Sequence, residues 1–152
     1  MAQKTFLPSE LAAVVAVIDP DANTAATYTT GWISMADFAT IMAVIMAGDL
    51  GASATLDAKL EQASDGSGTG AKDITGAAIT QMTQAGGDSN KQAILQCYAE
   101  DMDIGSDFTH VRLSMTVATA TSDCSAVVMG MGARYGPASD HDAASVSEIV
   151  SL

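Results

Sequence analysis

The sequence predicts an all-β fold, a jelly-roll-like β-sandwich with extended N- and C-terminal segments. Two stretches, residues 54–62 and 109–118, alternate apolar and polar side chains, as strands do when one face is buried. Clusters of Gly, Ser, Asp and Thr separate the apolar stretches at a spacing of roughly 10–15 residues, and no segment has the pattern of an amphipathic helix. Several short strands at such a spacing are typical of a sandwich or barrel.

The strongest strand signals also predict which strands pair. Residues 38–47 are apolar at both odd and even positions, which fits a strand buried on both faces or a buried helix. This run ends at Gly48-Asp49-Leu50-Gly51 and leads directly into the strand at 54–62. We therefore expect these two strands to form a hairpin, and we expect the strand at 109–118 to be central in its sheet.

Weaker signals supply the rest of the sandwich. Residues 74–84 and 125–131 are expected to be strands, and residues 91–99 fit either a strand or a helix. The Gly- and Ser-rich segment 64–70 resembles a phosphate-binding loop only superficially, because it lacks the terminal Lys-Ser/Thr and no helix follows it. We expect this segment to be a surface hairpin loop.

Composition and charge exclude several classes of protein. The 152 residues include 6 Lys and Arg against 18 Asp and Glu, which gives a formal net charge of −12, and 48% of them are hydrophobic. A chain of this length builds one domain around its own core. Its few, scattered basic residues exclude nucleic-acid binding through phosphates. The apolar run at 38–47 is too short to span a membrane, and we expect no signal peptide.

We divide this domain into three segments. Residues 1–30 are expected to form an N-terminal arm, residues 31–137 the β-sandwich core, and residues 138–152 an acidic C-terminal tail. Arm and tail are expected to become ordered against a partner. For the stretch Leu11–Ile18 the sequence leaves an alternative open, namely an ordinary edge strand of the same subunit. If the arm is correctly assigned, deletion of residues 1–10 weakens attachment to the partner but leaves the sandwich folded.

Residues that could support catalysis or bind a metal lack the spacing that such chemistry requires. His110 lies on the polar face of a predicted strand and His141 lies near the C-terminus, and no known nucleophile motif accompanies either. The carboxylates Asp101, Asp103 and Asp107 resemble a calcium loop. However, a loop counted from Asp101 has glycine at the fifth position instead of the sixth, and Arg112 replaces the bidentate Glu at the twelfth.

The two cysteines, Cys97 and Cys124, belong to no paired motif. We expect both to be reduced and buried, in the manner of small hydrophobic residues. Together with the missing catalytic and metal-binding motifs, this leads us to expect a protein that is not an enzyme and that needs no cofactor and no metal.

Aromatic, apolar and basic residues near the ends of predicted strands are expected to contact other proteins, because such residues are enriched in interfaces. The nine methionines, the strand that is apolar on both faces and the low charge density indicate more apolar surface than one sandwich buries. We therefore expect a homo-oligomer, a trimer. Trp32 fits plain core packing equally well. The predicted interface residues are Phe6, Leu7, Tyr28, Trp32, Arg134 and Tyr135.

Four segments together are similar to a group of small proteins encoded among the head genes of tailed bacteriophages. They are Thr30-Gly-Trp-Ile-Ser34 with Phe38 after it, the segment Leu60–Lys72, the segment Ala99–Arg112, and Arg134-Tyr-Gly-Pro137. The resemblance implies a virion component with a β-sandwich or jelly-roll core, and most naturally a head decoration protein, also called a cement protein. It further implies that the chain is made in the bacterial cytoplasm and binds the major capsid protein on the capsid exterior.

Two alternatives stay open at this point. The first is another station in the virion, a tail-tube, head-completion or neck subunit. The second is a carbohydrate- or ligand-binding β-sandwich used in host attachment, although sugar-binding surfaces expose several aromatic rings and this chain has only 1 Trp, 3 Tyr and 3 Phe. The copy number in the particle distinguishes these readings, since decoration proteins are present at many equivalent capsid positions.

Overall fold

The computed structural model describes residues 6–152, and the strands account for most of the regular structure. The one α-helix, α1, covers Pro8–Leu11, and the 3₁₀ turns are η1 (Ala99–Asp101), η2 (Ile104–Ser106) and η3 (Ala138–His141). The strands are β1 (Ala12–Asn23), β2 (Ala26–Thr29), β3 (Ile33–Ser34), β4 (Phe38–Ala47), β5 (Thr55–Ala63), β6 (Lys72–Ala78), β7 (Met82–Thr83), β8 (Gln92–Tyr98), β9 (His110–Ala118) and β10 (Ser122–Ala133). No helix within residues 6–152 is long and apolar enough to cross a membrane.

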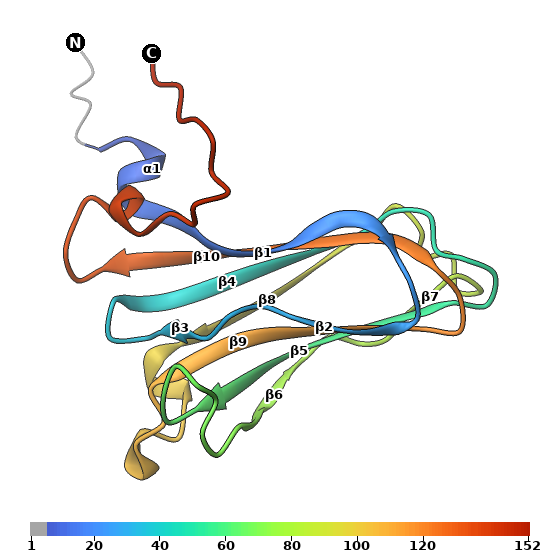
Figure 1. The fold of residues 1–152 in the computed structure, drawn as a ribbon, viewed down its shortest axis with the longest axis horizontal. Coiled ribbons are helices and arrows are strands. Elements are labelled where there is room, and N and C mark those ends of the chain that lie inside the picture. Colours follow the sequence, from blue (N-terminus) through green and yellow to red (C-terminus); the bar gives the residue numbers. More distant parts are fainter. Residues whose placement is uncertain (1–5) are drawn as a thin grey trace.

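The strands form two antiparallel sheets that pack face to face (Figure 1). Sheet A has the order β1-β10-β4-β8, and sheet B has the order β2-β9-β5-β6. Strand β3 continues β2 along β9, and β7 continues β6 along β5. When each of these pairs is counted as one strand, the eight strands follow the orders 1-8-3-6 and 2-7-4-5, which is the arrangement of a jelly roll. The predicted fold class is confirmed.

Alternation in the sequence determines which side chains enter the core. In β5 and β9 the apolar residues Leu56, Leu60, Leu113 and Met115 are fully buried, whereas the alternate residues Asp57, Lys59 and Ser114 point away from the core. Strand β9 pairs with β5 on one side and with β2 and β3 on the other, so it is central, as predicted. The segment 64–70 connects β5 with its neighbour β6, as a hairpin loop does.

The predicted hairpin between residues 38–47 and 54–62 is wrong. Both strands exist at these places, but β4 lies in sheet A and β5 lies in sheet B. The connection stays at the end of sheet A, where the Gly48 N–H donates to the Asp123 carbonyl over 2.7 Å, and then crosses to the other sheet. Alternation defines the two faces of a strand but not its lateral neighbour, and in a jelly roll most consecutive strands lie in opposite sheets.

Most of the predicted N-terminal arm belongs to the sandwich. Residues 12–29 provide β1 and β2, and β1 is an edge strand paired with β10 of the same subunit. The open alternative for Leu11–Ile18 therefore describes the structure, and the sandwich begins well before residue 31. Residues 1–5 of the predicted arm lie outside the described residues.

The segment 138–152 begins with a packed turn. Ala138 is fully buried, and η3 packs against α1 and β1. Immediately after it, Asp142 accepts a hydrogen bond from the Val14 N–H, and the Ala143 N–H donates to the Val14 carbonyl, each over 2.7 Å. These bonds occupy part of the otherwise open edge of β1. Most of the rest of the segment is exposed, with Val146 half-buried, and α1 and the C-terminal end of the chain lie at the same end of the sandwich (Figure 1).

Candidate functional site

The outer surface of sheet A is apolar although it does not face the core. Directly paired residues on neighbouring antiparallel strands point to the same side of a sheet. One row across sheet A therefore consists of Val17, Val127, Val44 and Ile94, and the next row of Val14, Met129, Met42 and Gln96. We call this surface the sheet A face. It comprises the outward residues Val14, Val17, Thr40, Met42, Val44, Met46, Gln92, Ile94, Gln96, Tyr98, Ser125, Val127, Met129 and Met131.

Solvent reaches several large side chains of the sheet A face. Met46 is 45% exposed, Ile94 is 59% exposed and Tyr98 is 60% exposed. These fourteen residues include no Asp, Glu, Lys, Arg or His, and the exposed carboxylates Asp19 and Asp123 border the face at its Met46 end. This arrangement explains why the sequence of β4 is apolar at every position: Ile41 and Ile45 fill the core, and Met42 and Val44 fill the outer surface. Contiguous exposed apolar patches mark sites of interaction with other proteins.

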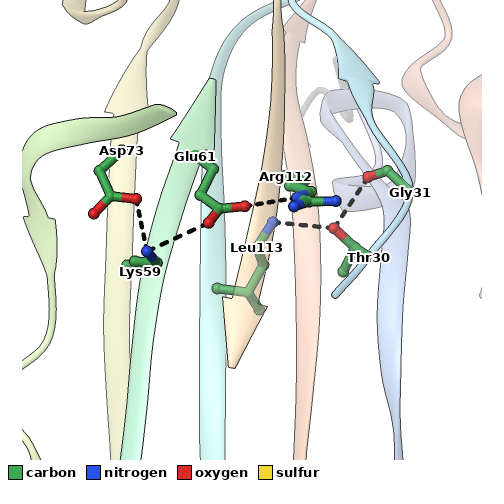
Figure 2. A network of polar contacts seen from close by, with 7 residues as sticks. All are labelled: Thr30, Gly31, Lys59, Glu61, Asp73, Arg112 and Leu113. Carbon is green, nitrogen blue, oxygen red and sulfur yellow. Dashed lines mark hydrogen bonds and ion pairs between the residues drawn. The ribbon is translucent and has the colours of Figure 1, made fainter. Parts of the chain in front are cut away.

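The outer surface of sheet B has the opposite character (Figure 2). Lys59 Nζ lies 2.7 Å from Asp73 Oδ1 and 3.4 Å from Glu61 Oε1, and Arg112 Nε donates to Glu61 Oε2 over 2.7 Å. The hydrogen bonds that Lys59 donates to Asp73 and to Glu61 raise the pKa of Lys59 against the effect of its partial burial. The network ties β6, β5 and β9 together, and it is satisfied within the subunit.

Two of the predicted interface residues are engaged within this subunit near sheet B. The Arg112 guanidinium lies over the Trp32 ring, 4.5 Å from its centroid, so Trp32 packs against the charged network. Tyr28 is half-buried in β2, and its hydroxyl donates to the Thr24 carbonyl over 3.1 Å.

The other four predicted interface residues lie near the end of the sandwich that holds both termini. Phe6 is 64% exposed and Tyr135 is 76% exposed, Arg134 is exposed, and Leu7 is half-buried at the start of α1. Because α1 packs against η3, the structure brings the neighbourhoods of Leu7 and Tyr135 to one end of the molecule but places Tyr28 and Trp32 on sheet B.

The histidines are not arranged for nucleophilic catalysis. His110 Nδ1 lies 2.9 Å from the Thr109 hydroxyl, which itself donates to the Ser64 carbonyl. Because the Thr109 hydroxyl donates its one proton to the Ser64 carbonyl, it accepts a hydrogen bond from His110 Nδ1. A general base would instead accept the proton of the hydroxyl, so His110 does not activate Thr109 as a nucleophile. His141 packs edge-on against Phe38, and its Nε2 lies 3.3 Å from the Tyr135 carbonyl.

The carboxylates that resemble a calcium loop have protein partners. Asp103 pairs with Lys72 over 2.6 Å, which lowers the pKa of Asp103, and Asp101 accepts from the Tyr98 N–H over 2.7 Å. Within residues 6–152 no three His, Cys, Asp or Glu side chains are grouped as a metal site would require.

Both cysteines are buried in the sheet A core, as predicted, and both are free. Burial, with a smaller effect of Asp101, raises the pKa of Cys97 to about 11, and burial also raises the pKa of Cys124. Cys97 faces Ile41 and Cys124 faces Ala47 along β4, which separates them by about 20 Å at ~3.3 Å per residue. An intramolecular disulfide is therefore excluded.

A cavity of about 540 Å³ opens at the end of sheet A beside Met46 and Asn90. Its ionisable side chains are Asp21 and Asp123, and it has no basic residue. It therefore lacks the convergent polar groups of a ligand site for anions, and its acidic pair has no further ligand for a metal.

Sequence reasoning missed the gathering of the valines at 14, 17, 44 and 127 with Ile94 on one outer surface. A signal was present, because residues 38–47 and 125–131 both have apolar residues on both parities. It could not be used before the strand order placed β4 and β10 side by side.

Comparisons with known proteins identify no family. No protein-family model and no curated protein sequence matches the chain. The fold is similar to a chain of broad bean stain virus, with a TM-score of 0.46 and 9% identity over 86% of this chain and 88% of the other. It is also similar to a chain of the cowpea mosaic virus top component, with a TM-score of 0.42 and 13% identity over 83% and 87%. A chain of infectious bursal disease virus, Gx strain, matches with a TM-score of 0.42 and 11% identity, over 84% of this chain and 33% of that chain. At these scores the likenesses assign no function.

Proposed function

We propose that this chain is a structural, non-enzymatic virion protein of a tailed bacteriophage that decorates and stabilises the exterior of the capsid as a cement protein. The single observation on which the proposal rests most is the sheet A face, a predominantly apolar surface on the outside of a jelly roll. Such a surface fits a protein that works by contact with other proteins. The four sequence segments that are similar to phage head-region proteins supply the kind of particle.

The charge distribution supports a position on the outside of the shell. The formal net charge is −12, and the outer surface of sheet B has the carboxylates of Asp57, Glu61 and Asp73. A surface that touches packaged DNA would instead need clustered Lys and Arg. A negatively charged exterior also keeps decorated particles apart in solution.

The proposed partners are the major capsid protein and further copies of this chain. A small sandwich bound at many equivalent capsid junctions stabilises the shell through its multiplicity, even where each contact is modest. The homotrimer expected from the sequence would occupy threefold or quasi-threefold junctions, whereas the single apolar face of the sandwich favours a twofold dimer, and the molar mass of the purified chain decides between the two. The predicted contacts with the shell are the exposed residues at the end of the sandwich, Phe6, Arg134 and Tyr135, with Leu7 beside them.

Binding of the purified protein to heads that lack it tests the proposal. We expect the full chain to co-sediment with expanded heads and to raise the temperature at which they open. Tyr135→Ser combined with Arg134→Ser should weaken the binding, and Thr29→Ser, on the outer surface of sheet B, serves as a matched control. If the full chain does not bind heads, and particles contain it in the neck or tail instead, the decoration role is wrong.

A further inference from the structure

We propose that the sheet A face binds the same face of a second copy of this chain, so that the isolated protein is a face-to-face dimer with twofold symmetry. The pairing is a property of the chain itself and does not depend on the proposed capsid role.

Charge selects the kind of partner. Across the paired parts of β1, β10, β4 and β8 the sheet A face has no ionised side chain, and Asp19 and Asp123 lie only at its Met46 end. The outer surface of sheet B, by contrast, has Asp57, Lys59, Glu61 and Arg112 in its middle. A basic partner would gain nothing from contact with a neutral face, so the partner surface is equally neutral and apolar. Two copies with a net charge of −12 each approach at the lowest electrostatic cost through surfaces that have no charge. A second copy supplies such a surface by definition.

The shape of the surface suits self-association. Two sheets that pack face to face lie about 10 Å apart with their strands at about 30°, and their side chains interdigitate. The central row of the sheet A face, Val17, Val127, Val44 and Ile94, offers a flat strip of branched side chains. Beside it lie Met42 and Met129, whose unbranched side chains adapt to irregular gaps. Under a twofold axis each of these rows meets its own copy.

The area is sufficient for a specific contact. Strand β4 pairs with β8 over Thr40–Met46, which is about 23 Å at ~3.3 Å per residue, and four strands at ~4.8 Å span about 19 Å. The planar footprint is therefore about 440 Å² for each copy and about 880 Å² for the pair. Interdigitated side chains bury more accessible surface than the plane that they cover, so the contact reaches the ~1,000 Å² of a specific interface.

Stoichiometry follows from the single apolar face. Each described chain has one sheet with a predominantly apolar outer surface, because the outer surface of sheet B is polar. When two such faces meet, neither copy keeps a second one exposed, and association stops at two. A trimer closed by this face alone would require the face to meet a different, polar surface of its neighbour.

The molar mass of the purified full chain tests the proposal. We expect 30.8 kDa, twice the 15.4 kDa of one chain, by light scattering and sedimentation velocity. Ile94→Glu places a charge on an exposed position of edge strand β8, where the monomer tolerates it. We expect this variant to sediment at 15.4 kDa, with the dissociation constant of the dimer raised at least about 100-fold. Val44→Asp, at the centre of the face, should have the same effect.

Thr29→Asp is the matched control. It adds the same kind of charge to an exposed strand position on the outer surface of sheet B and should leave a mass of 30.8 kDa, twice 15.4 kDa. Thermal unfolding is measured as well, because an added aspartate in Val44→Asp or Thr29→Asp also changes the stability of the monomer. The melting temperature of the unsubstituted chain should rise with protein concentration over about 1–100 µM, whereas that of Ile94→Glu should not.

Three results would overturn the pairing: a monomeric full chain, a trimer, or an oligomer whose mass Ile94→Glu leaves unchanged. The proposed function is judged separately by head binding. If the full chain is a monomer that binds heads, the dimer is wrong and the decoration role stands. If the full chain is a dimer that does not bind heads, the dimer stands and the decoration role is wrong.

Discussion

Substitution of Gly130 by alanine should destabilise the sandwich, because a Phe38 ring occupies the space that a side chain at this position would need. An ideal Cβ on Gly130 would lie 2.7 Å from Cδ1 and Cγ of Phe38 and 2.8 Å from its Cε1. Ordinary contacts begin at 3.4 Å, so the ring must move by at least 3.4 − 2.7 = 0.7 Å. Phe38 is only 3% exposed, and its ring packs against His141 with the centroids 5.2 Å apart. The ring therefore has little room to retreat.

The expected loss in the free energy of unfolding is the cost of overpacking the core minus the gain from a less flexible unfolded chain. Overpacking of a core costs about 1–3 kcal/mol. Loss of glycine's freedom in the unfolded chain returns about 0.4–1 kcal/mol. The net loss in the free energy of unfolding is about 1–2 kcal/mol, or roughly 2–8 °C in melting temperature for a chain of this size. Urea denaturation followed by circular dichroism measures both the midpoint and the slope.

Two comparisons separate the clash from a general effect of alanine. Gly31 has nothing within 4 Å of an ideal Cβ, so Gly31→Ala should change the free energy of unfolding by less than about 0.5 kcal/mol. In a Phe38→Ala background Gly130→Ala should cost nothing further, since the obstructing ring is gone, which gives a coupling of about 1–2 kcal/mol, the whole of its cost in the native background. If Gly130→Ala costs the same with and without the ring, the packing described for β4 and β10 is wrong.

Further expectations concern thiols, acid and metals. At pH 8 the native protein should react with a thiol reagent far more slowly than the unfolded chain, because Cys97 and Cys124 are buried and have raised pKa values; rapid labelling of both would contradict their placement. Hydrogen bonds from Thr69, from the Thr83 N–H and from Lys72 lower the pKa values of Asp65, Asp88 and Asp103 below 3.8. Their stabilisation is therefore complete above the unfolded pKa and is lost as the pH falls through the lower folded pKa values, which a titration of the melting temperature below about pH 4 detects as a decline. EDTA should leave the melting temperature unchanged, and a large drop would instead revive a calcium site at Asp101, Asp103 and Asp107.

Local pattern predicted individual strands well, because alternation reports directly which side chains are buried. Strands β5 and β9 lie within one residue of the stretches at 54–62 and 109–118, and β4 coincides with 38–47. Strand β1 was harder to recognise. Its apolar first part is followed by Asp19, Pro20 and Asp21 at a bulge, so its polar second half looked like part of a connection.

Lateral arrangement could not be predicted by the same reasoning. The short connection from β4 favoured a hairpin on local grounds, but the chain crosses to the other sheet. The sheet A face has the same origin: Val17, Val127, Val44 and Ile94 are far apart in the sequence and form one row only through the strand order β1-β10-β4-β8. For the same reason the predicted residues Tyr28 and Trp32 lie away from this face.

Electron cryo-microscopy of phage particles that contain this chain tests the proposed capsid role most directly. The account predicts jelly-roll density of this size on the outside of the head, repeated at equivalent junctions of the capsid protein, with no contact to packaged DNA. Density for this chain in a ring of about six or twelve copies at the neck or along the tail, or only at a fibre tip, would contradict it.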